Sequence, residues 1–267
     1  MNINELAKKS NLGVRGYYLV AFNELRAFFI YKTSIFQNII SPFLFYIFVI
    51  EALGQNIGVF YYRGTNIGYP TFALLGLMAM NVMGQLTTAI YRATVDKRYG
   101  LMAMKFKNGI KPTIYLMGLA TYQITSFLIE VIVLYVMFNL FGHRIPIGLY
   151  ILTVLLSIVF IIFWVSIGAS LSILINNYHK RDRIITFLVK PLTFAAPVFF
   201  VREYAHPVIR FFSSINPLTY QLDAMRSVAY GEPRWYLLGI TIGISIFTVI
   251  LVSFILRKAK VPLSERM

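Results

Sequence analysis

Residues 149–175, LYILTVLLSIVFIIFWVSIGASLSILI, decide the fold because they form an apolar run without a single charged side chain. A helix needs roughly 20 such residues to cross the bilayer core, which is about 30 Å thick. The whole chain has a matching composition, since 58% of its 267 residues are hydrophobic and 13% are charged. Soluble domains are roughly 45–50% apolar and about 25% charged. The sequence therefore predicts a polytopic membrane protein.

Six segments satisfy the same length criterion, and a helix in each gives an all-α fold with six transmembrane helices. The segments are residues 33–54, 69–91, 113–141, 149–175, 185–201 and 235–256. The fifth is the shortest and contains Lys190, Pro191 and Pro197. Proline breaks or kinks a helix, so this segment is expected to be tilted, broken or only partly inserted. The six segments define a transmembrane domain at 33–256, between an N-terminal segment at 1–32 and a tail at 257–267.

Lysine and arginine are distributed unevenly between the two sides of the membrane. When the six helices alternate in direction, most of the 25 basic residues fall on the side that carries both termini. Cytoplasmic loops carry the excess of basic residues, so both termini are expected in the cytoplasm and the protein in the plasma or inner membrane. The net charge of +15 forms no single patch, which argues against nucleic acid as a partner. The chain has no cysteine, so disulfides and thiolate sites are excluded.

A short segment before the last span has clear helix start and stop signals. Asn216 is a good N-cap, Pro217 suits the first helical position, and Gly231 can provide a left-handed C-terminal cap. One face of this helix is apolar, while Asp223 and Arg226 lie three residues apart on another face and can pair. The helix is therefore expected to rest at the outer membrane surface with one side in water. The alternative is an ordinary interfacial helix without a special role.

The N-terminal segment at 1–32 also has helical periodicity. Its spacings of three and four connect Tyr17, Ala21, Leu25, Phe28 and Lys32, whereas Arg26 points elsewhere. Aromatic and basic side chains on such a helix anchor it at the inner membrane interface. We therefore expect an amphipathic interfacial helix. The alternative is a surface helix that only orients the first span.

The connection at 92–112 mixes charges with apolar residues at helical spacing. The apolar positions are Val95, Tyr99, Met102 and Phe106, and charged residues including Asp96 and Arg98 surround them. A helix of this kind can insert its apolar edge into a groove on a partner while its basic rim guides docking. The alternative is a solvated basic loop that only satisfies the topology.

Several polar residues fall inside the predicted spans. A charge at the bilayer centre costs about 2.5–3.5 kcal/mol even on lenient scales, so such residues are functional candidates. Glu130 and Lys190 are expected either to pair across the bundle or to face a water-filled path. Asn81 and Gln85 lie in a polar run of the second span and are further candidates for a transport path.

The chain has no means of its own to use ATP. A phosphate-binding Walker loop needs Gly-Lys followed by Ser or Thr, and none of the 17 glycines is followed by lysine. His143, His179 and His206 fall on different loops on opposite sides, which argues against a metal cluster. We therefore expect no cofactor and no catalytic residue in this chain.

Asn216-Pro217-Leu218-Thr219-Tyr220, followed by Asp223, Arg226 and Gly231, resembles the signature of the type-2 ATP-binding-cassette (ABC) exporter permeases. Asp96-Lys97-Arg98-Tyr99-Gly100 is similar to the start of that family's coupling helix, although the family often carries Glu where this chain has Lys97. The resemblance implies that the coupling and interfacial helices contact an ATPase subunit, which binds ATP and Mg. It also implies short re-entrant helices at 199–234 and a homodimer with two ATPase subunits, held in membrane lipid.

The motif at 216–231 is more similar to the drug and antibiotic export branch of that family than to the polysaccharide or teichoic acid branch, which stays open as the alternative. Two other classes compete with an ABC permease. An ion-coupled secondary transporter would use Glu130 as the carrier and would work without ATP. A membrane-embedded enzyme would need a convergent catalytic set, which the sequence does not offer.

Overall fold

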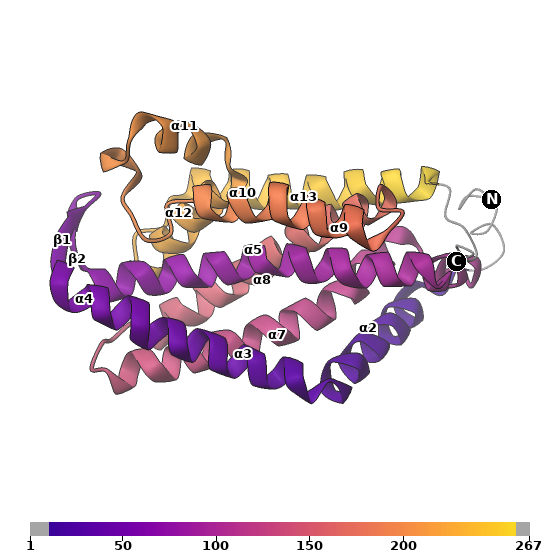
Figure 1. The fold of residues 1–267 in the computed structure, drawn as a ribbon, viewed down its shortest axis with the longest axis horizontal. Helices are drawn as coiled ribbons and strands as arrows, with labels where there is room; N and C mark the ends of the chain where they lie inside the picture. The colour runs from indigo at the N-terminus through magenta and orange to yellow at the C-terminus, as the bar shows by residue number, and fades with distance from the viewer. Residues whose placement is uncertain (1–10, 260–267) are drawn as a thin grey trace.

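The computed structural model describes residues 11–259, which fold into a nearly all-α bundle with its long helices along one axis (Figure 1). Five helical runs are long and apolar enough to cross a membrane: Lys32–Ile57, α5 (Tyr69–Arg98), α7 (Pro112–Leu140), α8 (Ile147–Ile173) and α13 (Trp235–Lys258). They correspond to five of the six predicted spans.

The first run is built from three consecutive helical segments. These are α3 (Lys32–Phe45), the π-helical η1 (Tyr46–Glu51) and α4 (Ala52–Ile57). Pro42 lies inside α3, where it lacks the N–H that an α-helix needs at that position. The wider π-helical turn follows directly, so the run changes its hydrogen-bonding pattern without ending.

The centre of the bundle is the packing of α5 against α8. Gly168 permits the two backbones to approach closely, because a Cβ at this position would lie 2.8 Å from the Cβ of Ala89. α5 is mostly buried, whereas α13 and the run at Lys32–Ile57 expose most of their apolar side chains. The exposed helices therefore form the outside of the bundle.

The fifth predicted span, residues 185–201, is helical only as far as Ala195, and its helical run begins earlier, at Tyr178. The run consists of α9 (Tyr178–Ile184), the π-helical η2 (Ile185–Val189) and α10 (Lys190–Ala195). This run is not among the five helices that satisfy the length and hydropathy criterion. It nevertheless carries the chain from the end of α8 along the bundle, in contact with α5, toward the opposite end (Figure 1).

One end of the bundle carries a β-hairpin that the sequence did not lead us to expect. Strand β1 (Val59–Tyr62) pairs antiparallel with β2 (Thr65–Gly68), and Tyr62 is opposite Thr65. Both residues of the two-residue turn, Arg63 and Gly64, have positive φ, as such hairpin turns require. The same end holds η3 (Arg202–Tyr204), α11 (Pro207–Ile215) and α12 (Pro217–Ala229). We call it the hairpin end.

The opposite end carries α2 (Gly13–Ile30) and α6 (Leu101–Lys107). α2 packs on α7, where Gly118 leaves room for Val20, since a Cβ at residue 118 would lie 2.6 Å from that side chain. The short α6 follows α5 after a turn at Gly100, whose φ of 71° is the left-handed conformation that glycine favours. We call this the α6 end. Residues 1–10 and 260–267, which include most of the predicted tail, lie outside the described part of the chain.

Candidate functional site

The helix start and stop signals predicted for α12 (Pro217–Ala229) are confirmed. The Asn216 side chain accepts a hydrogen bond from the N–H of Leu218 at 3.0 Å, and Pro217 is the first helical residue. At the other end the N–H of Glu232 bonds to the carbonyl of Ser227 and that of Gly231 to Val228. Gly231 has a φ of 77°, so the helix ends in a Schellman motif.

α12 does not rest at a surface, which corrects the prediction from its amphipathic pattern. Ten of its side chains are buried, including those of Asp223 and Arg226. Asn216 also donates to the carbonyl of Leu192 in α10, and Trp164 in α8 donates to Gln221. Tyr220 is one of the three α12 residues that are not buried; it is 41% exposed and donates to the carbonyl of Ser214. The helix is therefore buried and connects α5, α8 and α10.

The predicted pair of Asp223 with Arg226 is wrong. Asp223 instead forms an ion pair with Arg63 in the hairpin turn, at 2.8 Å, and accepts a hydrogen bond from the Tyr62 hydroxyl at 3.4 Å. Burial raises the pKa of Tyr62, so this hydroxyl keeps its proton and remains a donor. Although burial alone lowers the pKa of Arg63, Asp223 outweighs it and raises that pKa. Tyr62 and Arg63 therefore both remain donors to the Asp223 carboxylate.

Arg226 is 2% exposed, and its guanidinium binds groups within the protein. Its guanidinium donates to the carbonyls of Pro197 at 3.1 Å, Val198 at 2.9 Å and Phe72 at 3.3 Å. The carbon at the centre of the guanidinium lies 3.5 Å from the centroid of the Phe72 ring, a cation–π contact. Arg226 thus joins α12, α5 and the segment after α10.

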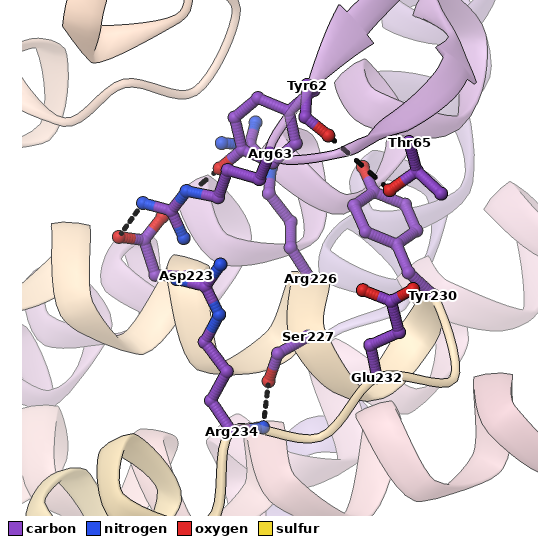
Figure 2. A pocket seen from close by; sticks show the side chains of 9 residues that line it. All are labelled: Tyr62, Arg63, Thr65, Asp223, Arg226, Ser227, Tyr230, Glu232 and Arg234. Atoms are coloured by element: carbon purple, nitrogen blue, oxygen red, sulfur yellow. Dashed lines mark hydrogen bonds and ion pairs between the residues drawn. The ribbon is translucent and has the colours of Figure 1, made fainter.

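These side chains line a small polar cavity at the hairpin end (Figure 2). Its walls are Tyr62, Arg63, Thr65, Asp223, Arg226, Ser227, Tyr230, Glu232 and Arg234. The space inside is about 20 Å³, enough for roughly one water molecule. The cavity is too small for an organic substrate, and the contacts of Arg63 and Tyr62 with Asp223 in its wall join the hairpin to α12.

At the α6 end, two of the predicted partner anchors are buried in this chain. Met102 and Phe106 are both 0% exposed, and the Phe106 ring packs edge-to-face on Tyr115 in α7 at 5.5 Å between centroids. These two side chains attach α6 to its own bundle, so their assignment to a partner groove is wrong. Periodicity identified an apolar face without showing what covers it.

A different set of apolar side chains is exposed at the α6 end. Val95 is 38% exposed, Tyr99 62%, Leu101 41% and Met104 52%. We call these four residues the α6 patch. Arg98 precedes Tyr99 and Lys105 follows Met104 in the chain, and Lys107 is a further basic residue at the end of α6.

Buried ionic contacts hold the α6 patch in place. Asp96 is 8% exposed, pairs with Lys105 and accepts a hydrogen bond from Tyr115 at 2.9 Å. Lys97 donates to the carbonyls of Ile173 at 3.0 Å and Ile175 at 2.8 Å, at the C-terminal end of α8. An ammonium group at this position satisfies carbonyls that the helix leaves without partners. α5, α6, α7 and α8 are therefore joined directly under the patch.

α2 is attached by a buried ion pair that the sequence did not reveal. Glu24 is 3% exposed and pairs with Arg92 in α5, whose guanidinium also lies over the Tyr122 ring. Phe28 packs against the same ring, as a buried face predicts, while Arg26 is exposed as expected.

Two other predicted residues of α2 are not part of its buried face. Tyr17 is 37% exposed and Leu25 is half-buried, so the buried face is shifted by about one residue. It includes Gly16, Val20 and Glu24 as well as Ala21 and Phe28 from the predicted face. The hydrophobic periodicity of the sequence could not reveal that Glu24 is buried, because it counts glutamate among the polar, exposed residues.

The residues predicted to line a transport path lie on three helices: Asn81 and Gln85 on α5, Glu130 on α7 and Lys190 on α10. Within residues 11–259 no hydrogen bond or ion pair joins any two of them. Lys190 is exposed, whereas Glu130 accepts a hydrogen bond from Ser126 at 3.4 Å, so the proposed Glu130–Lys190 pair is not formed. Gln85 is 4% exposed and its carbonyl oxygen has no partner in the described chain. No group of three His, Cys, Asp or Glu residues within 11–259 could hold a metal ion.

The family comparison agrees with this architecture. A family model described as ABC-2 type transporter matches residues 18–230, which include most of α2 as well as α6, the hairpin and α12. No curated protein matches the chain. Because the family model covers most of its length, the chain belongs to the ABC-2 type transporter family.

Proposed function

We propose that the chain is the permease subunit of an ATP-driven exporter, working as a homodimer with two separate ATPase subunits. Family membership already makes it the membrane domain of an ABC transporter, a type of domain that is generally non-catalytic and works with an ATP-binding-cassette subunit. In this proposal ATP and Mg bind to that partner, and this chain provides the path across the membrane.

The α6 patch is the observation that carries the proposal. It presents exposed apolar side chains, although the loop connecting two spans would ordinarily be polar on its solvent side. The buried contacts of Asp96 and Lys97 beneath it join four helices, so a force applied to the patch reaches the bundle. A rigid apolar patch with basic neighbours is suited to docking into a partner's groove.

The distribution of charge supports an orientation with the α6 end in the cytoplasm. Lysine and arginine concentrate there, in the segments at 92–111 and 180–183 and at the end of α13. By the positive-inside rule we place this end in the cytoplasm and the hairpin end outside. In that orientation the run of α9, η2 and α10 crosses the membrane between α8 and α13, which brings the number of crossings to six. α11 and α12 are then the re-entrant helices.

For the cargo, we favour an amphipathic drug-like or lipid-like molecule, with polysaccharide or teichoic acid as the alternative. The motif at 216–231 supports this branch, and the exposed apolar sides of α13 and of the run at Lys32–Ile57 give such a molecule access from the membrane. Stimulation of ATP hydrolysis by amphipathic compounds, measured on the reconstituted complex, tests this choice against lipid-linked glycans.

The docking proposal is tested by replacing Tyr99 and Met104 together with Ser. The variant should insert and fold normally, because neither side chain is buried, but capture much less of the ATPase subunit. The matched control replaces Phe211 and Phe212 with Ser, since these are similarly exposed, at 62% and 56%, but lie at the hairpin end. Equal capture by both variants and the parent would remove the α6 patch as the docking surface.

A further inference from the structure

An open groove follows the first helical turns of the run that returns from the α6 end. It is shallow and open to the outside, with a volume of about 400 Å³, and is lined by Lys180, Arg183, Ile184, Phe187 and Leu188. Phe187 is 77% exposed and Leu188 is 52% exposed. We call it the α9 groove.

The lining residues are ordered along the helix by their chemistry. Their spacing of three, four and seven residues places them on one side of the run through α9 and η2. The two basic residues come first, at the α6 end, and the three apolar residues follow toward the middle of the bundle. A membrane lipid has the same order, with its polar headgroup at the interface and its acyl chain below.

The two basic side chains are not used by the protein itself. Arg181 pairs with Asp182 at 2.9 Å and lies over the ring of Tyr91, so this acid already has a partner. The side chains of Lys180 and Arg183 make no hydrogen bond or ion pair with any residue in 11–259. Within the described part of the chain, two positive charges without an ionic partner therefore lie next to an apolar surface.

We propose that the α9 groove binds an anionic phospholipid, with its phosphate on Lys180 and Arg183 and an acyl chain along Phe187 and Leu188. Basic pockets next to membrane helices recognise anionic headgroups in this way. A second copy of the chain is a poorer occupant, because a two-fold interface brings the same patch together and this patch has no acidic side chain to pair with the cations. The proposal requires only that the bundle lies in a bilayer, so it does not depend on the cargo or its direction of transport.

The test measures lipids that remain bound to the full chain. The protein is reconstituted in nanodiscs of phosphatidylcholine with phosphatidylglycerol, released in mild detergent and weighed by native mass spectrometry. K180Q/R183Q should retain one phosphatidylglycerol fewer per chain, with roughly 10- to 30-fold weaker binding. R257Q/K258Q is the control, since it removes the same charge from the same end of the bundle, at the end of α13. K180R/R183K should behave as the parent.

A second variant, F187S/L188S, tests the acyl-chain part of the groove and should also lose the lipid. Equal losses in K180Q/R183Q and R257Q/K258Q would show general attraction to a basic surface and overturn the site. Retention of phosphatidylglycerol by F187S/L188S would overturn the acyl-chain position. Unchanged lipid retention in K180Q/R183Q together with loss of self-association or of ATPase binding would make the groove a protein interface instead.

Discussion

Arg63 in the hairpin turn and Asp223 in α12 form an ion pair at 2.8 Å, although 160 residues separate them in the sequence. Figure 2 shows the arginine reaching from the hairpin to the helix. The pair is mostly buried, since the side chains are 22% and 9% exposed. It therefore attaches the hairpin to the helix that carries the family signature.

A double-mutant cycle tests this attachment. Arg63→Ala and Asp223→Ala should each lower the free energy of unfolding by about 1–3 kcal/mol, because each leaves a partly buried charge without its partner. The double variant should lose less than the sum of the two, with a coupling of about 0.5–3 kcal/mol. Thermal unfolding of the purified protein in nanodiscs measures all four forms. Additive losses would mean that the pair contributes nothing.

Arg226 should depend on the shape of its side chain as well as on its charge. The guanidinium donates to three carbonyls, and the single ammonium of Lys cannot serve Phe72 and Pro197 from the same position. Arg226→Lys should therefore destabilise the protein, at about 1–3 kcal/mol for each buried carbonyl left without a donor. The yield of monodisperse protein and its unfolding temperature report the loss. Full stability of Arg226→Lys would show that charge alone is sufficient.

The ion pair at the hairpin end could not be predicted from the sequence. Helix spacing identified Asp223 and Arg226 as possible partners, but spacing reports only the neighbours within one helix. The true partner, Arg63, lies in the hairpin turn. In the sequence it is an isolated basic residue far from α12. The run Val59–Tyr62, rich in aromatic residues and followed by Arg-Gly, was the available signal for a hairpin.

The spans and the caps were more predictable because they depend on local chemistry. Hydropathy located five of the long helices, and Asn216 and Gly231 marked the ends of α12. For Met102 and Phe106 the periodicity was real, yet a helix can turn an apolar face toward its own bundle as readily as toward a partner. Only the packed structure distinguishes these two cases.

The Glu24–Arg92 pair predicts a direction of pH dependence. Burial raises the pKa of Glu24 above its ordinary value of 4.5, even though Arg92 acts to lower it. A raised pKa stabilises the folded state at low pH, and that stability is lost as the pH rises through the folded-state pKa. The non-titrating variant Glu24→Gln should therefore gain in unfolding temperature relative to the parent as the pH rises from 4.5. A relative loss over the same range would show that the ion pair outweighs the cost of burial.

Gly76 and Gly84 in α5 provide a matched pair of substitutions. A Cβ at residue 76 would lie 2.1 Å from the carbonyl oxygen of Val198, whereas a Cβ at residue 84 meets nothing within 4 Å. Gly76→Ala should cost at least about 1–3 kcal/mol, because backbone has to move to relieve the overlap. Gly84→Ala should be neutral or stabilise the helix by up to about 1 kcal/mol. Unfolding of the two variants in nanodiscs compares them directly.

The same carbonyl of Val198 accepts a hydrogen bond from Arg226 at 2.9 Å, so the cost of Gly76→Ala should depend on Arg226. Displacing Val198 breaks that hydrogen bond as well as the packing against α5. In an Arg226→Ala background the bond is already absent, and Gly76→Ala should cost less than in the parent. An equal cost in both backgrounds would mean that Val198 moves without disturbing Arg226, and that α5 and α12 are not joined through this carbonyl.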